Sequence, residues 1–178
     1  MTETPPGDQP ATPDSNLDKR PTMATIDLDG VVSDTRHRLH YLQTRPKNWD
    51  AFFDAARADA VLAEGLGVAR TLAEQAEIAY LTGRPERCRA DTEDWLREHD
   101  LPPGQVLMRR PGDRRPGAMI KAAVWRRLSR THRLVMAVDD DPKVIEQARK
   151  AGIPVLLADW MPEEAEGPLH EAQDEGKT

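Results

Sequence analysis

Acidic residues stand at the end of the first short apolar segment of the sequence. The segment 24–28 contains Asp27, and Asp29 follows directly after it. Side chains two residues apart on a strand point to the same side of it, so we expect these two carboxylates to share one site. Two carboxylates so close together need a cation, or one of them must hold a proton. An Asp-rich turn without chemistry is the alternative, since Gly30 allows a sharp turn here.

A second acidic group consists of the three consecutive residues Asp139 to Asp141, which follow the apolar run 134–138. Together with the first pair of carboxylates, these residues offer only oxygen ligands, which suit Mg²⁺ better than zinc. Asp141 precedes a proline and suits the N-cap of a following helix. We therefore take Asp139 and Asp140 as the candidate metal ligands, although three consecutive carboxylates leave the register of that assignment open.

The elements that must position these residues alternate between strands and helices. Short apolar runs that end in polar turns predict strands at 24–28, 78–81, 106–108, 134–138 and 153–157. Helices are predicted at 62–74, 86–99, 118–128 and 142–151, with two short helices within 36–53. This alternation predicts an α/β fold, a three-layer Rossmann-like arrangement around a parallel sheet with right-handed crossovers.

Ligands of an open parallel sheet bind beyond the carboxyl ends of its strands. Asp27 and Asp29 end the first predicted strand, and Thr82 ends the second. Asp139 begins the acidic group at the end of another strand. The topology therefore predicts that separate segments deliver polar side chains to one edge of the sheet.

Four segments resemble, in order, the four motifs of the haloacid dehalogenase superfamily. They are Asp27-Leu28-Asp29-Gly30-Val31-Val32, Thr82-Gly83-Arg84, Lys121 and Asp139-Asp140. The resemblance covers residues 23–160 and implies the fold of that superfamily. It also implies a small helical cap inserted at about 34–60, between the first two motifs.

The resemblance implies a phosphatase with a role for each motif residue. Asp27 would attack phosphorus and form an aspartyl-phosphate, and Asp29 would protonate the leaving oxygen and then activate water. We expect Asp29 to have a raised pKa because other carboxylates lie near it. Thr82 would hold a phosphoryl oxygen, and Lys121 would neutralise charge on the phosphate and the nucleophile. Taken alone, Lys121 is typical of a solvated helix lysine and Thr82 of a cap.

The same resemblance implies Mg²⁺ as the cofactor. Its ligands would be Asp27, Asp140 and the backbone carbonyl of Asp29, with Asp139 in support. All of these ligands are oxygen atoms, as Mg²⁺ prefers.

A narrower resemblance concerns the segments 107–115 and 138–145 together with the third motif. They are similar to the phosphatase half of phage-type polynucleotide kinase-phosphatases, which remove 3′-phosphates from nucleic-acid ends. We expect Arg109, Arg84 and Gly83 to bind the substrate phosphate, because a guanidinium can grip two phosphate oxygens. Alternatively, Arg109 and Arg115 are loop residues that pair with nearby acids.

The sequence departs from that family in three places. Gly117 stands where an acidic residue commonly precedes the motif lysine, and Asp141 stands where arginine is common. The sequence also has no G-x-x-x-x-G-K-[ST] motif, so we do not expect a kinase half within it.

Charge is distributed unevenly along the chain, whose net charge is -6. The acidity comes from the segments 1–22 and 161–178, which are poor in apolar residues and are expected to be disordered tails. Residues 23–160 are close to neutral, and the stretch 105–133 holds nine Lys and Arg against one acid. A basic flank of this kind could contact phosphates, or it could be a solvated helix face.

The chain has a single cysteine, Cys88, so it forms no internal disulfide, which suits a reducing cytoplasm. The sequence shows no signal peptide and no apolar run long enough to span a bilayer. We therefore expect a cytoplasmic protein without a membrane partner.

Three functions remain open from the sequence. The first is a phosphatase acting on the 3′-phosphate of DNA or RNA, and the second is a phosphatase of a small phosphomonoester such as a nucleotide or sugar phosphate. The third is a non-catalytic phosphate-binding or partner-docking protein. The aromatic residues of the cap segment either stack on a base or form a small core, and we favour the core for Phe52 and Phe53.

Overall fold

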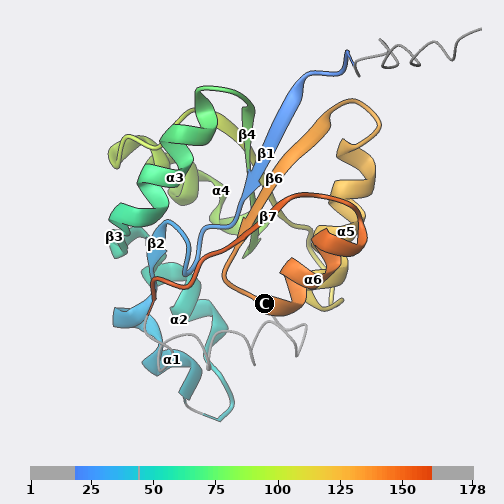
Figure 1. The fold of residues 1–178 in the computed structure, drawn as a ribbon. Helices are drawn as coiled ribbons and strands as arrows, with labels where there is room; N and C mark the ends of the chain where they lie inside the picture. Colours follow the sequence, from blue (N-terminus) through green and yellow to red (C-terminus); the bar gives the residue numbers. More distant parts are fainter. Residues whose placement is uncertain (1–18, 44, 162–178) are drawn as a thin grey trace, which may run out of the picture.

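Five parallel strands form the central sheet, in the order β5-β4-β1-β6-β7 (Figure 1). The computed structural model describes residues 19–43 and 45–161. The strands of this sheet are β1 (Thr22–Ile26), β4 (Glu77–Pro85), β5 (Gly104–Arg109), β6 (Arg133–Asp139) and β7 (Val155–Leu157). Each lies on a segment where the sequence predicted a strand, so the predicted α/β fold class is confirmed.

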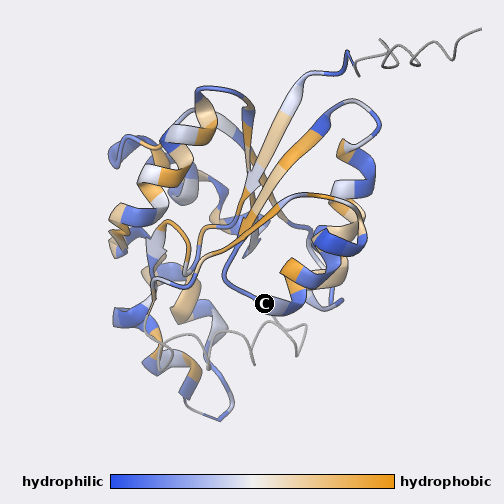
Figure 2. Ribbon diagram, in the orientation of Figure 1, coloured by the Kyte–Doolittle hydropathy of each residue, from blue (hydrophilic) through white to orange (hydrophobic). Residues whose placement is uncertain are grey.

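Helices cover both faces of the sheet (Figure 1). α3 (Ala63–Ala73) and α4 (Arg89–Glu98) lie on one face, and α4 follows the short 3-10 helix η3 (Glu86–Cys88). α5 (Gly117–Leu128) and α6 (Pro142–Lys150) lie on the other face. Figure 2 shows apolar residues concentrated in the strands between these two helical layers.

One tryptophan anchors each helical layer to the core. Trp95 of α4 packs in the cluster that contains Ile26 and Tyr80. Trp125 of α5 packs with Leu81 on the opposite face, and its indole donates a hydrogen bond to Thr25 Oγ1 at 3.0 Å. These rings fix α4 and α5 against the strands whose ends carry the predicted site.

The chain between β1 and α3 forms a separate small layer beyond the carboxyl ends of the strands (Figure 1). Its elements are β2 (Ser33–Asp34), η1 (Arg36–Arg38), α1 (His40–Gln43), α2 (Trp49–Asp54), η2 (Ala55–Ala58) and β3 (Ala60–Val61). β2 and β3 pair antiparallel, so this segment leaves the core and returns to it through one two-stranded ribbon. Phe52 and Phe53 are buried in an apolar cluster with Leu39, Leu42 and Cys88, which agrees with a small core.

The tails expected at 1–22 and 161–178 lie outside the described residues except at their inner ends. There, Thr22 begins β1, and Met161 is buried against the apolar cluster of the cap segment. Within the described residues, none of the helices has the length and apolar character needed to cross a membrane.

Candidate active site

The carboxyl ends of β1 and β6 bring Asp27, Asp139 and Asp140 together. The two central strands pair in parallel, and the backbone N–H of Asp27 continues their ladder by donating to the carbonyl of Val138 at 2.9 Å. All three aspartates are buried. Each offers a carboxylate oxygen, and these oxygens lie within 4.8 Å of one another.

Gly30 makes the close approach of Asp140 possible. Its φ of +84° belongs to the left-handed region, which glycine enters without a steric penalty. A Cβ atom at this position would overlap the carboxylate of Asp140. The sharp turn after β1 therefore presses the backbone of the first motif against the carboxylate of the fourth motif.

Lys121 reaches the acidic cluster from α5. Its Nζ lies 2.9 Å from Asp27 Oδ2 and 2.6 Å from Asp139 Oδ2. The side chain is buried, which excludes the interpretation of Lys121 as a solvated helix residue. Burial lowers the pKa of an ammonium group, but Asp139 and Asp27 outweigh it and raise the pKa of Lys121 above its ordinary value. The ammonium charge is therefore retained.

Burial dominates the protonation of the nearby carboxylates. It raises the pKa of Asp27 to about 6, although Lys121 opposes this shift. It also raises the pKa of Asp139 well above the ordinary value. Both shifts arise because a carboxylate away from water loses its hydration and lies beside other carboxylates. A bound cation would relieve this cost.

The donor set fits a divalent cation. Asp27 Oδ1 is buried and has no hydrogen-bond partner, while the other oxygen of this carboxylate faces Lys121. Both oxygens of Asp139 are engaged, one with Lys121 and the other with the backbone N–H of Asp141 at 3.2 Å. Asp141 caps α6 by accepting from the N–H of Lys143, as predicted. The free oxygen of Asp27 and the carboxylate of Asp140 are therefore the best placed to bind a metal such as Mg²⁺.

Asp29 lies in different surroundings from Asp27. Its Oδ1 accepts from Arg38 Nη2 at 2.5 Å and from Arg84 Nη2 at 2.6 Å. Burial alone would raise the pKa of Asp29, but the two guanidinium groups outweigh it and hold that pKa well below its ordinary value. The expectation of a raised pKa for Asp29 is wrong, because its nearest charges are arginines and not carboxylates.

Asp59 holds the two arginines from the other side. It accepts from Arg38 Nε at 2.8 Å and from Arg84 Nη2 at 3.2 Å. It also pairs with Ser33 Oγ and with His37 Nε2. We refer to Asp29, Arg38, Asp59 and Arg84 as the arginine clamp.

The cap segment and helix α4 meet at this clamp. Arg38 belongs to η1, and its guanidinium lies 4.1 Å from the centre of the Phe52 ring. Asp59 stands just before β3, where Trp95 of α4 donates to its carbonyl at 2.9 Å. The sequence analysis singled out neither Arg38 nor Asp59, and Asp59 lies in an alanine-rich stretch without any motif.

The second motif lies within the last residues of β4. Thr82 is buried, and its hydroxyl oxygen accepts from the N–H of Arg84 at 3.1 Å, so its own proton remains available to an incoming oxygen atom. A Cβ at Gly83 would meet no atom within 4 Å, so the space beside this residue is open. The guanidinium of Arg84 is occupied by the clamp rather than extended into solvent.

Arg109 ends β5 and is buried. Its Nη1 donates to the carbonyls of Asp113 and Arg115, at 3.0 Å and 2.9 Å, and so anchors the loop after β5. Its Nε and Nη2 are buried without a hydrogen-bond partner. Burial lowers the pKa of Arg109 below its ordinary value. Unsatisfied buried donors on a cation are costly, and a phosphate oxygen would satisfy them.

Comparison with known proteins agrees with this geometry. The sequence model of the polynucleotide kinase PNKP phosphatase domain matches residues 21–159. A search among curated proteins finds no significant match. Together, the match and the buried acidic cluster support an enzyme site rather than a simple Asp-rich turn.

Solved structures share the fold. A chain of the Pnkp1/Rnl/Hen1 RNA repair complex superposes with a TM-score of 0.66 and 21% identity, over 79% of this chain and 43% of that chain. This chain therefore spans less than half the length of that relative. The haloacid dehalogenase-like protein SP0104 from Streptococcus pneumoniae gives a TM-score of 0.53 and 15% identity, over 76% and 83% of the two chains. The putative HAD-hydrolase YfnB from Bacillus subtilis, bound to magnesium, gives a TM-score of 0.53 and 10% identity, over 78% of this chain and 89% of that chain.

Proposed function

Because this chain belongs to the family of the polynucleotide kinase PNKP phosphatase domain and is a phosphatase of the haloacid dehalogenase superfamily, we propose that it hydrolyses the 3′-phosphate of a nucleic-acid end with the help of Mg²⁺. The observation that carries this proposal is the contact of Lys121 with Asp27 and Asp139 at the edge of the sheet. Each polar residue at that edge has a role in the proposed reaction.

Asp27 is the nucleophile in this proposal. One oxygen of the Asp27 carboxylate attacks phosphorus, the bond from phosphorus to the leaving oxygen breaks, and an aspartyl-phosphate forms. Water then attacks phosphorus, and Asp27 is released as a carboxylate together with inorganic phosphate. Lys121 remains charged throughout and offsets the negative charge that the phosphoryl oxygens and Asp27 share. The Thr82 hydroxyl donates to one phosphoryl oxygen.

Asp29 moves the proton in both steps. It must be protonated to release the leaving oxygen, whereas the clamp keeps it ionised in the free protein. We propose that the substrate phosphate takes over one guanidinium donor of Arg84 and so raises the pKa of Asp29 toward the range for proton transfer. As a carboxylate, the same group then accepts a proton from the attacking water.

Mg²⁺ would be held by Asp27, Asp140 and the backbone carbonyl of Asp29, with Asp139 orienting Lys121 beside it. When bound, the ion neutralises charge on the phosphoryl group and on the carboxylates. The raised pKa of Asp27 supports this assignment, because a bound cation would offset the cost of burying the ionised carboxylate.

Arg109 supports a phosphorylated nucleic-acid end as the substrate. Its two unsatisfied donors lie at the carboxyl end of β5, at the same edge of the sheet as Asp27. It belongs to the basic stretch 105–133, whose charge is suited to an extended anion. The similarity to a chain of an RNA repair complex supports RNA ends as well as DNA ends as substrates.

Release of inorganic phosphate tests the proposal. We expect Mg²⁺-dependent release from a 3′-phosphorylated oligonucleotide to exceed release from its 5′-phosphorylated counterpart and from free nucleotides. Asp27→Asn should lower the rate by several orders of magnitude because the amide oxygen is a poor nucleophile. Equal release by this variant would contradict the assignment of the nucleophile. A preference for free nucleotides would instead favour the small-phosphomonoester alternative.

A further inference from the structure

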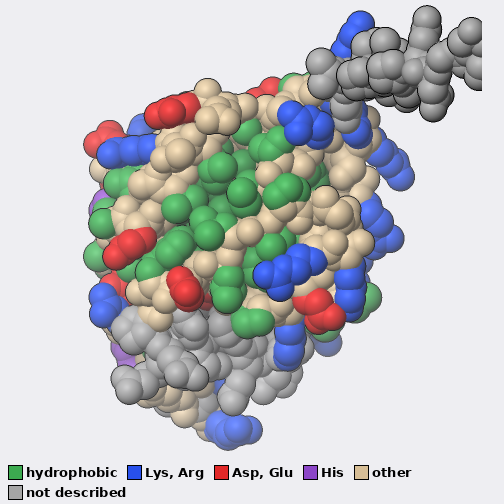
Figure 3. Space-filling model, in the orientation of Figure 1, with side chains coloured by type: hydrophobic (Ala, Val, Ile, Leu, Met, Phe, Trp, Pro, Cys, Tyr) green, Lys and Arg blue, Asp and Glu red, His purple; other side chains and the backbone are tan. Residues whose placement is uncertain are grey.

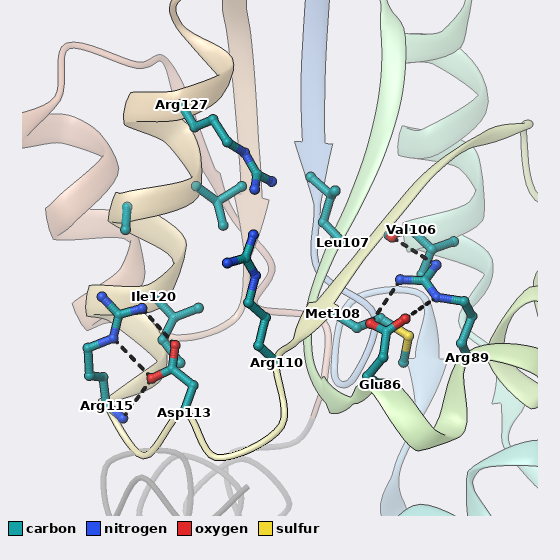
Figure 4. Close-up of a pocket in the computed structure, with 12 residues that line it drawn as sticks. Glu86, Arg89, Val106, Leu107, Met108, Arg110, Asp113, Arg115, Ile120 and Arg127 are labelled. Carbon is teal, nitrogen blue, oxygen red and sulfur yellow. Dashed lines mark hydrogen bonds and ion pairs between the residues drawn. The ribbon is translucent and has the colours of Figure 1, made fainter.

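A cavity of about 460 Å³ lies over the edge strand β5 (Figure 4). One side of it comes from η3 and α4, and the other from α5 and the loop after β5. Leu107, Ile120 and Val124 supply apolar surface, while Arg110 and Arg127 supply charge. Its volume falls within the range of about 300–1,000 Å³ that is typical of small-ligand sites.

The lining of this cavity carries more positive than negative charge. Glu86 is paired with Arg89, and Asp113 is paired with Arg115 at 2.6 Å, so both acids that line the cavity are neutralised. The guanidinium groups of Arg110 and Arg127, by contrast, form no hydrogen bond or ion pair with any described residue. The cavity therefore carries the positive charge of two guanidinium groups.

These two guanidinium groups point toward one another. In Figure 4, Arg110 extends from the loop after β5 along the cavity, and Arg127 extends to meet it from α5. Like charges that converge repel one another, and an anion between them removes that repulsion. A guanidinium is also the side chain best suited to hold phosphate oxygens in pairs.

The cavity adjoins the candidate active site through the chain itself. Arg110 directly follows Arg109, so one short segment sends one arginine to the edge of the sheet and the next into the cavity. Because β5 is the outermost strand on its side of the sheet, a polymer that leaves the active site past the carboxyl end of β4 can run along the outer edge of β5. Space-filling Figure 3 shows further Lys and Arg side chains along the margin that α5 and α6 form.

We propose that the Arg110–Arg127 cavity binds an internal nucleotide of the strand whose 3′-phosphate is hydrolysed at Asp27. This inference rests on the proposed function and adds the substrate's second point of contact. The phosphodiester lies between Arg110 and Arg127, and the base packs on the apolar surface of Leu107 and Val124. A nucleotide contacts both the two guanidinium groups and the apolar surface of the cavity, whereas inorganic phosphate would leave the apolar surface uncovered.

The double variant Arg110→Gln/Arg127→Gln tests this inference. We expect KM for a 3′-phosphorylated hexanucleotide to rise about tenfold, because the charge-assisted hydrogen bonds to the phosphodiester are removed, with kcat unchanged. KM for a nucleoside 3′-monophosphate, which has no internal phosphodiester, should stay within about twofold. The slope of log(kcat/KM) against log[salt] for the hexanucleotide should become shallower by about 0.7 for each phosphate that the protein no longer neutralises.

Arg126→Gln/Arg130→Gln is the matched control. It removes two exposed charges near the end of the same helix, outside the cavity. We expect it to change KM for the hexanucleotide by less than about twofold. An equal effect of both double variants would overturn the inference, because net charge alone would then explain the binding.

A second outcome would also overturn it, namely an equal rise of KM for the hexanucleotide and the nucleoside 3′-monophosphate in the cavity variant. Failure of the proposed function appears differently, as a wild-type protein that releases no phosphate from either 3′-phosphorylated substrate. In that case, binding of a 3′-hydroxyl hexanucleotide, measured by fluorescence anisotropy, still decides the inference. Unchanged affinity in the cavity variant would overturn it, and an affinity lowered about tenfold would support it.

Discussion

Lys121 of α5 bridges Asp27 at the end of β1 and Asp139 at the end of β6, with its Nζ 2.9 Å and 2.6 Å from their carboxylates. The three groups are buried, so each charge depends on the others. Removing one member leaves an uncompensated charge away from water. This relationship couples the stability of the fold to the chemistry of the site.

Lys121→Met should therefore lower both activity and stability. The variant leaves Asp27 and Asp139 facing each other without a cation, and we expect the free energy of unfolding to fall by about 3–5 kcal/mol in metal-free buffer. Denaturant unfolding measures this loss. Lys150→Met is the control, since Lys150 forms an exposed pair with Glu146 and should contribute about 0–1 kcal/mol. Equal losses in the two variants would contradict the structural role of Lys121.

Asp59→Asn should weaken the arginine clamp. The amide cannot balance the charges of Arg38 and Arg84, which then share Asp29 alone. We expect the free energy of unfolding to fall by about 3 kcal/mol, as for other broken buried ion pairs. Thermal unfolding together with kcat measures the effect, and Asp54→Asn, at an exposed pair with Arg87, serves as the matched control. A melting temperature unchanged by Asp59→Asn would show that the clamp does not stabilise the fold.

The metal-free protein should lose stability as pH rises from about 4 to about 6. Burial raises the pKa of Asp27 from 3.8 to about 6, so in this window the folded state holds a proton that the unfolded chain has released. The folded state then binds more protons, and the free energy of unfolding falls with rising pH. The raised pKa of Asp139 adds to the same trend.

The pKa of Asp29 is shifted in the opposite direction, so this group does not titrate between pH 4 and pH 6. Its stabilising contribution is present above its ordinary pKa of 3.8 and is lost only in stronger acid. Denaturant titrations in EDTA from pH 4 to 7 measure the slope, which Asp27→Asn should reduce. Added Mg²⁺ should stabilise the wild type more at pH 7 than at pH 5, since a metal binds the ionised carboxylates. Stabilisation by Mg²⁺ that does not depend on pH would argue against Asp27 as a ligand.

Gly30→Ala should disrupt the acidic cluster. The φ of +84° disfavours any side chain, and the new Cβ would overlap the carboxylate of Asp140. We expect a loss of at least about 1–2 kcal/mol in stability and of most Mg²⁺-dependent activity. Gly67→Ala is the control, because the space around Gly67 of α3 is open and alanine favours helices by about 1 kcal/mol. Full activity of Gly30→Ala would show that Asp140 need not approach the backbone so closely.

Local sequence patterns were sufficient to predict the sheet. Each strand of the parallel sheet combines an apolar run with a polar end, and burial on both faces makes such runs continuous. The same patterns led to Asp27, Thr82 and Asp139, because chemistry at the carboxyl ends of parallel strands falls at fixed places in the sequence. Lys121 followed only from its place in the order of the four motifs. The N-cap role of Asp141 could be predicted because the capping hydrogen bond joins residues that are close in the sequence.

The environment of Asp29 could not be predicted in the same way. Asp27 and Asp29 are the same residue type and lie two positions apart in one motif. Burial among acids nevertheless raises the pKa of Asp27, whereas Arg38 and Arg84 lower the pKa of Asp29. Arg38 comes from the cap segment, and both arginines are held in place by Asp59, which carries no motif.

The sequence by itself thus determined the order of the strands along the chain and, through the resemblance of its motifs, an expected phosphatase with its candidate residues, because those features depend on local patterns. Only the tertiary structure decided that Asp29 faces the arginine clamp and that Lys121 also contacts Asp139. It also decided that Arg110 and Arg127 meet over β5. The physical reason is that pKa values and ion pairs depend on distances between segments far apart in the chain, and packing alone sets those distances.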